Sequence, residues 1–530
     1  MSFLLNVYGL SNQYTLYRYI DLLTQLKNIT VGITLEFETL FSLGLYFCAM
    51  IGIGIYAYRK TTNDVSGYML GGRSLSPSVT ALSAGASDMS GWMLMGLPGA
   101  MYITGVSSLW IAIGLVIGSF LNYLVVAPRL RTYTELANDS ITLPDFFEHR
   151  FEDKSRALRL ISSIVIIVFF TLYTSSGIVA GGKLFESSFG LNYELGLYVT
   201  AGVVVSYTLF GGFLAVSLTD FVQGCIMFIA LVLVPVVVIN DVGGLATVHS
   251  SIQEINPELL NMFSGMGIVG IISAMSWGLG YFGQPHIIVR FMAIRSVKDI
   301  PTARRIGMSW MIVAICGAMA TGFAGIVYVK NTNVALADPE TIFILLSQVL
   351  FSPLISGFLL AAILAAIMST ISSQLLVTSS SLTGDFYHTF LDKKASDQRL
   401  VLVGRISVLI VALVAVYLAY DRNSSVLDLV SNAWAGFGSA FGPVVILSLF
   451  WKKMNRNGAL AGMVVGAVTV LIWIYAPITI NGQSLSASIY EIVPGFILST
   501  IAIVVVSKTT GNISPSIEKL FDKVEVIHAQ

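Results

Sequence analysis

The chain has 530 residues, of which 55% are hydrophobic and 11% charged, and its mean hydropathy is +0.81. A soluble domain carries about 25% charged residues, so this composition indicates an integral membrane protein. The formal net charge of zero and the lack of any basic run in the sequence argue against nucleic-acid binding.

Residues 1–35 form an N-terminal extension before the first apolar segment. Charges at Arg18 and Lys27 make it too polar for the apolar region of a secretory signal. Leu16 and Ile20 recur at helical spacing, which predicts a helix lying at the membrane surface, with a disordered tail as the alternative.

Thirteen apolar stretches are long enough to cross the roughly 30 Å hydrocarbon core of a bilayer. They lie at residues 37–57, 75–104, 107–127, 160–182, 191–211, 216–240, 264–289, 307–329, 347–385, 402–419, 426–450, 458–477 and 489–507. We therefore expect an all-α, multi-pass membrane domain over residues 36–507, surrounded by lipid. Residues 508–530 would form a cytoplasmic tail.

The distribution of Lys and Arg predicts the orientation of these spans. If the N-terminus is outside, 24 of the 29 basic residues fall in cytoplasmic segments, Arg290 among them. Cytoplasmic loops are enriched in Lys and Arg, so the pattern predicts an outside N-terminus and a cytoplasmic C-terminus.

The second span carries Asp88, the only charged residue between Arg73 and Arg129. A charge near the bilayer centre costs roughly 2.5–3.5 kcal/mol on insertion scales, so it is usually retained for a task. Gly85 and Gly91 flank it and would let the helix unwind and turn its carbonyl groups toward an ion. These features predict a broken helix at the centre of an ion-coupled transporter.

Two further spans contain candidate residues whose role the sequence leaves open. Tyr173 in the fourth span could line a pocket for a compact solute or simply pack between helices. Asp220 lies near the predicted cytoplasmic end of the sixth span. It either lines the exit route of a cation or is a carboxylate at a helix start, where the helix dipole favours it.

The seventh span is interrupted in the same way as the second, by three glycines and Pro285 between residues 277 and 285. Trp277 and Tyr281 lie one helical turn apart there and could form walls of a solute pocket, with helix packing as the alternative. Interrupted helices at corresponding positions of two halves indicate an inverted-repeat transporter with its site near the midplane.

The ninth span offers oxygen atoms that suit sodium. The hydroxyls of a helical Ser or Thr lie beside the carbonyl three or four residues earlier, so Ser369, Thr370 and the Ala366 carbonyl can share one patch. The alternative is that both hydroxyls only bond back to their own helix.

Other chemistries receive little support from the sequence. Residues 265–270 match G-x-G-x-x-G without a surrounding βαβ unit, and residues 177–183 only approach a phosphate-binding loop. The five histidines and three cysteines are scattered without metal-ligand spacing. We therefore expect no ATP coupling, no organic cofactor and no enzymatic activity.

The motif Gly-Gly-Arg-Ser at 71–74, followed by Ala-Leu-Ser-Ala-Gly-Ala-Ser-Asp-Met-Ser-Gly-Trp at 81–92, resembles the sodium/solute symporter family. Further likeness covers residues 145–156, 176–181, 280–286, 368–370 and 433–438, and the whole runs from about 40 to 508. Residues 1–35 are an addition to the family pattern, and residues 331–340 match it poorly.

The resemblance implies a leucine-transporter-like fold of 13 transmembrane helices. Spans 2–6 and 7–11 would form two inverted repeats of five, at about 74–241 and 264–451, with one helix before them and two after. Family sodium ligands fall on Ala86, Met89, Ala366, Ser369 and Thr370. Asp88 and Asp220 would support sodium coupling or passage. Substrate positions fall on Ser90, Gly91, Trp92, Tyr173, Trp277 and Tyr281.

The function implied is uptake of L-proline coupled to inward sodium movement by alternating access, in a bacterial cytoplasmic membrane. Sodium would be co-transported. Another small solute in the same fold remains an alternative: a different amino acid, a betaine-like compound or pantothenate. Proton coupling fits these ligands less well than sodium coupling, because Ser369 and Thr370 do not titrate.

A membrane sensor is a further alternative, but we expect the tail of about 23 residues to be too short for a signalling domain. The sequence does not specify the oligomeric state.

Overall fold

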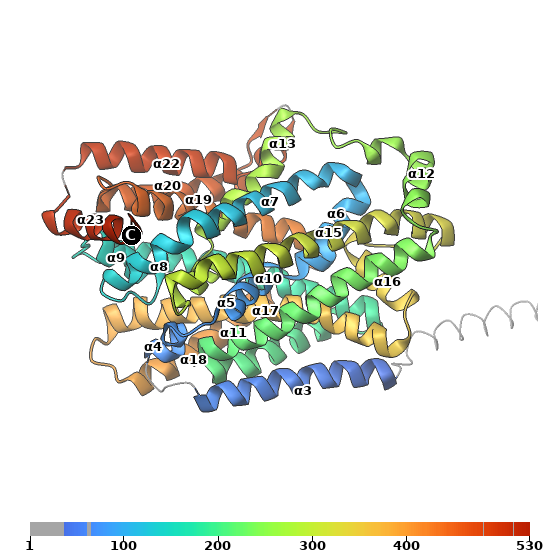
Figure 1. Cartoon of the computed structure of the whole chain (residues 1–530), viewed down its shortest axis with the longest axis horizontal. Helices are drawn as coiled ribbons and strands as arrows, with labels where there is room; N and C mark the ends of the chain where they lie inside the picture. Colours follow the sequence, from blue (N-terminus) through green and yellow to red (C-terminus); the bar gives the residue numbers. More distant parts are fainter. Residues whose placement is uncertain (1–36, 61–64, 481, 512, 530) are drawn as a thin grey trace, which may run out of the picture.

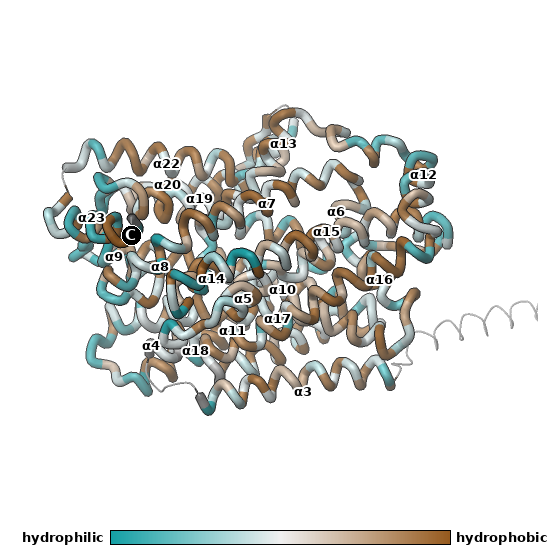
Figure 2. Tube along the Cα trace, in the orientation of Figure 1, coloured by the Kyte–Doolittle hydropathy of each residue, from teal (hydrophilic) through white to brown (hydrophobic). Residues whose placement is uncertain are grey.

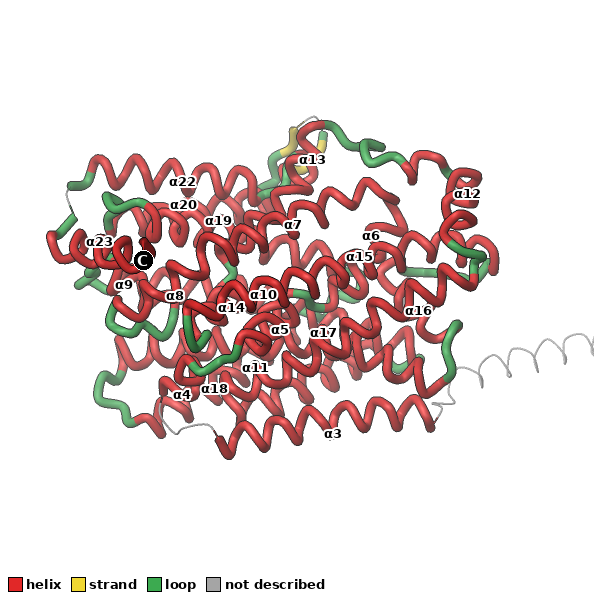
Figure 3. The backbone as a smooth tube through the Cα atoms, in the orientation of Figure 1, coloured by secondary structure: helices red, strands yellow, loops and turns green. Residues whose placement is uncertain are grey.

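The computed structural model describes residues 37–60, 65–480, 482–511 and 513–529. The predicted surface helix within residues 1–35 lies outside the described residues. Helices make up nearly all of the described chain, and Figure 3 shows two short strands beside α13 at the upper edge of the view. These strands, β1 (Thr479–Ile480) and β2 (Gln483–Ser484), pair antiparallel.

The long helices lie side by side along the longest axis of the molecule (Figure 1). In chain order, the long and short α-helices of the described residues are α3 (Phe37–Lys60), α4 (Val65–Leu70), α5 (Pro77–Asp88), α6 (Leu97–Thr104), α7 (Leu109–Leu121), α8 (Ala127–Leu136), α9 (Leu143–Arg150), α10 (Ala157–Phe189), α11 (Tyr193–Asp241), α12 (Leu245–Ile255), α13 (Ile268–Met275), α14 (Pro285–Ala293), α15 (Ile300–Thr332), α16 (Ile342–Val349), α17 (Pro353–Ser380), α18 (Asp397–Leu418), α19 (Val426–Phe450), α20 (Arg456–Tyr475), α21 (Leu485–Ser488), α22 (Ile492–Thr509) and α23 (Pro515–Ala529).

Hydropathy follows this arrangement. Figure 2 shows apolar residues along the long helices and polar residues concentrated toward the two ends, around α9 and α23 on one side and α12 on the other. Long helices satisfy most of their backbone polar groups internally, which is what a hydrocarbon environment requires.

Ten helical segments among the described residues are long and apolar enough to cross a membrane. They cover the first, third, fourth, sixth and eighth to thirteenth predicted spans. The second and seventh are broken, and the fifth is the part of α11 before Gly212, where a φ of 59° interrupts the helix. The total of thirteen spans, their orientation, the domain boundaries and the inverted pairing stay predictions.

The predicted break in the second span is confirmed. Helix α5 ends at Asp88, Met89 has non-helical angles (φ −84°, ψ 76°), and the chain becomes helical again in a π-helical turn, η2 (Trp92–Gly96). The predicted break in the seventh span is confirmed too. A 3-10 helix, η6 (Ser276–Gly283), follows α13, and Gln284 is extended before Pro285 starts α14.

The ninth predicted span began too early. The segment 347–385 was expected to be continuous, but α16 ends at Val349 and α17 begins at Pro353. Proline lacks a backbone N–H and is favoured in the first turn of a helix, so Pro353 begins a new one. Most residues of α17 are buried, because α3, α5, α10, α11 and α18 pack around it.

Candidate functional site

The broken helix α5 meets α17 through the predicted sodium ligands. The Ser369 hydroxyl donates to the Ala86 carbonyl at 2.7 Å and lies 3.1 Å from the Ala366 carbonyl. The Thr370 hydroxyl lies 3.4 Å from the Ala86 carbonyl and 3.2 Å from the Ala366 carbonyl. All four residues are buried. The two hydroxyls therefore contact their own helix and also the opposite one.

The break releases two backbone carbonyl groups, and that of Ala86 contacts α17. In a continuous helix the N–H of Ser90 would donate to Ala86, and that of Met93 to Met89. Here the Ser90 N–H donates to the Asp88 carbonyl at 3.0 Å, and the Met93 N–H donates to the Ser90 carbonyl at 3.0 Å. The Ala86 and Met89 carbonyls are thus freed from their usual helical donors.

Asp88 connects this break to the predicted substrate residues. Its carboxylate Oδ2 accepts a hydrogen bond from the Tyr281 hydroxyl at 2.5 Å. Its backbone carbonyl accepts from Trp92 Nε1 at 3.1 Å and from the Tyr173 hydroxyl at 3.5 Å. Oδ1 has no hydrogen-bond partner among the described residues. A cavity of about 20 Å³ adjoins Asp88 and is also lined by Ala81, Ala84, Gly85, Met89, Ser119, Tyr123, Tyr281, Ile287, Gly307 and Met311.

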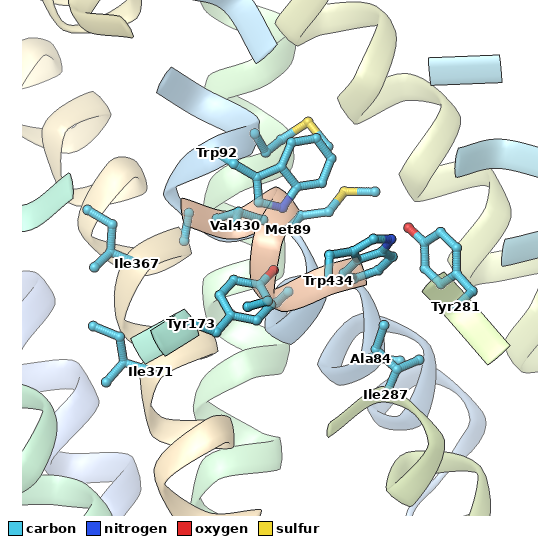
Figure 4. Packing of buried hydrophobic residues seen from close by; sticks show 14 of the residues in the cluster. Ala84, Met89, Trp92, Tyr173, Tyr281, Ile287, Ile367, Ile371, Val430 and Trp434 are labelled. Atoms are coloured by element: carbon cyan, nitrogen blue, oxygen red, sulfur yellow. The ribbon is translucent and has the colours of Figure 1, made fainter. Parts of the chain in front are cut away.

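Aromatic rings surround the break (Figure 4). The Trp92 and Trp277 rings are 6.2 Å apart, and Trp277 stacks on Tyr490 at 5.5 Å. Tyr281 meets Trp434 edge to face at 5.1 Å, and Trp434 Nε1 donates to the Trp277 carbonyl at 2.7 Å. Rings from both broken helices and from α19 thus form one cluster.

Ser90 and Gly91 lie in the break itself. The Ser90 hydroxyl oxygen is 3.5 Å from the Trp92 N–H. A Cβ at position 91 would lie 2.9 Å from the Ala180 Cβ and 3.2 Å from Ile367 Cγ1. Glycine is therefore needed at this position for close packing against α10 and α17.

Asp220 is fully buried in a polar cluster of its own. Its Oδ2 accepts from the Ser83 hydroxyl at 2.8 Å, the Ser373 hydroxyl at 3.3 Å and Arg290 Nη2 at 3.1 Å. Neither Asp220 nor Arg290 has an exposed side chain. Arg290 also lies with its guanidinium over the Phe213 ring, 5.2 Å from the centroid.

The Asp220 cluster adjoins the group of predicted sodium ligands around Ser369, called the Ser369 site below. Ser83 lies one turn before Ala86 on α5, and Ser373 lies one turn after Ser369 on α17. Asp220 itself is inside α11, eight residues after the interruption at Gly212, and so is not at a helix start. Asp220 therefore contacts residues on both α5 and α17 that lie one helical turn from the predicted ligands.

Arg290, Trp434 and Asn122 are among the participants that were not predicted from the sequence. Arg290 was counted only among the basic residues of the cytoplasmic segments, and the structure buries it against Asp220. Trp434 contacts Tyr281 and Trp277, and Asn122 Nδ2 donates to the Tyr281 carbonyl at 3.0 Å. An arginine that follows a broken apolar helix was a usable signal for Arg290. Nothing local marks Asn122.

Comparison with known proteins identifies relatives of this chain. Residues 68–466 match the model of the sodium:solute symporter family. The chain is 60% identical to the osmoregulated proline transporter OpuE of Bacillus subtilis (strain 168), covering 93% of this chain and 99% of that protein. It is 56% identical to the sodium/proline symporter 2 of Staphylococcus saprophyticus, covering 93% and 97%.

A solved structure gives the fold. A Na⁺-coupled sialic acid symporter in a substrate-bound outward-open state superposes with a TM-score of 0.75 at 20% identity, covering 90% of this chain and 99% of that one. The predicted leucine-transporter-like fold class is thereby confirmed. The chain belongs to the sodium:solute symporter family.

Proposed function

We propose that this protein couples inward sodium movement to the uptake of L-proline by alternating access. The observation that carries the proposal is the contact of the Ser369 and Thr370 hydroxyls with the Ala86 carbonyl, across two helices. The names of the relatives, which include sodium/proline symporter and proline transporter, support proline as the solute.

The sodium site consists of the carbonyls of Ala86, Met89 and Ala366 and the hydroxyls of Ser369 and Thr370. A hydroxyl that donates to a carbonyl can turn its hydrogen away and offer a lone pair to a cation, because the hydroxyl rotor is free. Sodium would then replace the two hydrogens that link Ser369 and Thr370 to Ala86. The site binds without a full charge among its five ligands, which suits a monovalent cation in a water-poor interior.

Coupling follows because ion and solute share the break in α5. Ordering of the Ala86 carbonyl by sodium also fixes Asp88, whose carbonyl is bonded to Trp92 and Tyr173. The solute pocket formed by Ser90, Gly91, Trp92, Tyr173, Trp277 and Tyr281 is prepared by the same event. Each ligand must then raise the affinity of the other by the same factor.

Asp220 is the next carboxylate on the sodium route toward the cytoplasm. It accepts from the Ser373 hydroxyl, one helical turn after Ser369, and its ion pair with Arg290 neutralises it in this conformation. Sodium that leaves the Ser369 site inward would meet the oxygens of Ser83, Ser373 and Asp220 in place of the guanidinium.

The energy available is sufficient for concentrative uptake. One charge moving through 100 mV releases about 2.3 kcal/mol, and a tenfold sodium gradient adds about 1.4 kcal/mol. One-to-one coupling can therefore sustain a solute gradient of several hundredfold, since each 1.4 kcal/mol is a factor of ten.

Uptake of labelled proline into proteoliposomes tests the proposal. We expect uptake to require an inward sodium gradient and to be abolished when potassium or choline replaces sodium. Unlabelled proline should compete better than glycine betaine, pantothenate or other amino acids. Sodium-independent uptake would refute the coupling, and stronger competition by another solute would refute proline as the substrate.

A further inference from the structure

Helix α3 precedes the ten predicted core helices, yet it presents one narrow buried stripe to them. Its buried residues recur at intervals of three and four: Thr39, Leu43, Tyr46, Met50, Gly54 and Ala57. The residues between them are largely exposed. This spacing is that of a helix packed lengthwise along a partner. Figure 1 shows α3 running along the edge of the bundle.

The partner at one end of the stripe is α17. The Thr39 hydroxyl donates to the Pro353 carbonyl at 3.0 Å, and the Ser42 hydroxyl donates to the Leu354 carbonyl at 2.9 Å. A Cβ on Gly357 would lie 2.8 Å from the Thr39 backbone, so the two helices touch there. Helix α3 is thus bonded to the first turn of the helix that carries Ser369 and Thr370.

Midway along α3, the stripe carries a phenol. Tyr46 is 5% exposed, and its hydroxyl accepts from Gln223 Nε2 at 2.8 Å and donates to the Met368 sulfur at 3.6 Å. A second buried phenol, Tyr207, donates to the Met368 carbonyl at 3.0 Å. Met368 directly precedes Ser369. Two phenols from two helices therefore hold the residue next to the proposed ligands.

We infer that Tyr46 and Tyr207 are positioning residues for the sodium site. By holding the side chain and the carbonyl of Met368, they fix the rotation of α17 about its axis. That rotation decides whether Ser369 and Thr370 face the Ala86 carbonyl. Through this contact, helix α3 holds in place the α17 side of the site, which carries Ser369 and Thr370, although α3 itself supplies no ligand.

This assignment rests on the proposed function and makes a different prediction from it. Loss of one phenol hydroxyl leaves the five ligands in place but loosens their arrangement. A hydrogen bond contributes about 0.5–1.5 kcal/mol, so each single Tyr→Phe change should raise the sodium half-saturation constant about twofold to tenfold. Proline affinity measured at saturating sodium should stay at the wild-type value.

The experiment compares Tyr46→Phe, Tyr207→Phe and the control Tyr198→Phe in proteoliposomes. Tyr198 is on the same helix as Tyr207, but its side chain is exposed and its hydroxyl contacts Tyr420. We measure sodium and lithium half-saturation, proline affinity at saturating sodium, and the sodium-induced rise in melting temperature. The inference expects a weaker sodium response and a changed sodium-to-lithium ratio in the first two variants only.

Three outcomes would overturn the inference. Wild-type sodium half-saturation in both phenol variants would remove the positioning role. Equal loss of sodium and proline affinity, or a lower melting temperature with an unchanged sodium-induced rise, would reduce it to ordinary packing. A wild-type protein without sodium dependence would instead refute the proposed function, so the two failures are distinguishable.

Discussion

Among single residues, Asp88 joins the two broken helices. It ends α5 beside the proposed ion site, and its carboxylate is bonded to Tyr281 of η6. Asp88 is 3% exposed, so the phenol supplies the hydrogen bond that water would give elsewhere. The contact lets a change at the ion site reach the aromatic cluster through one residue.

Removal of the Tyr281 hydroxyl should weaken this link. A hydrogen bond to a charged group contributes about 1.5–3 kcal/mol, so Tyr281→Phe should raise the half-saturation constant for proline by about tenfold or more. The half-saturation constant is measured from the kinetics of proline uptake at saturating sodium, with Tyr417→Phe, at an exposed position of α18, as the matched control. Wild-type kinetics in Tyr281→Phe would exclude a role for the Asp88 contact.

Among the helices, the interrupted seventh span depends on glycines in α7. A Cβ on Gly114 would lie 2.2 Å from the Met275 carbonyl oxygen, and one on Gly118 would lie 2.1 Å from that of Gly278. Small residues four apart let membrane helices approach closely, as in GxxxG motifs. The 3-10 segment η6 that carries Trp277 and Tyr281 is therefore positioned by backbone contact with α7.

Gly118→Ala should separate α7 from η6. The added methyl group meets backbone atoms that cannot rotate away, and such overpacking costs about 1–3 kcal/mol of stability. We therefore expect the melting temperature to fall and proline uptake to drop at least tenfold. The control is Gly202→Ala on α11, where a Cβ has no neighbour within 4 Å. A Gly118→Ala protein that transports and melts like wild type would contradict this packing argument.

The sequence predicted the features that local chemistry determines. Gly85 and Gly91 predicted the first break, and the glycines and proline at 277–285 predicted the second. Helical periodicity predicted that Ser369 and Thr370 reach the Ala366 carbonyl. Contact of these hydroxyls with Ala86 joins residues 283 and 284 positions apart, so it needed the family resemblance. The buried pairing of Arg290 with Asp220 is tertiary too, so counting charges along the sequence could not reveal it.

Across the whole molecule, ionic contacts connect the helices at both ends of the bundle. On the predicted cytoplasmic side, Arg159 pairs with Asp145, Glu148 and Asp385. These contacts join α9, α10 and the π-helical segment η9 (Ser381–Leu391). Transport by alternating access would require this end to open after sodium and solute have bound.

On the predicted outer side, Lys183 of α10 lies 2.9 Å from both Asp338 and Glu340. Glu340 also accepts the N–H groups of Val426 and Leu427 at the start of α19, each at 3.0 Å. A cavity of about 620 Å³ adjoins these residues. The segment 331–340, which matched the family pattern poorly, thus ends in a contact between three helical regions.

The central claim is that α5 and α17 hold sodium jointly, and equilibrium binding of radiolabelled sodium to the purified protein tests it most directly. The double variant Ser369→Ala/Thr370→Ala removes two of the five proposed oxygen ligands. We predict that its sodium dissociation constant rises at least tenfold, since each lost polar contact costs about 1–3 kcal/mol.

The matched control is Ser309→Ala/Thr332→Ala, which removes two α15 hydroxyls that bond only to their own helix among the described contacts. Its sodium affinity should equal that of wild type. Sodium binding by Ser369→Ala/Thr370→Ala with wild-type affinity would contradict the shared site.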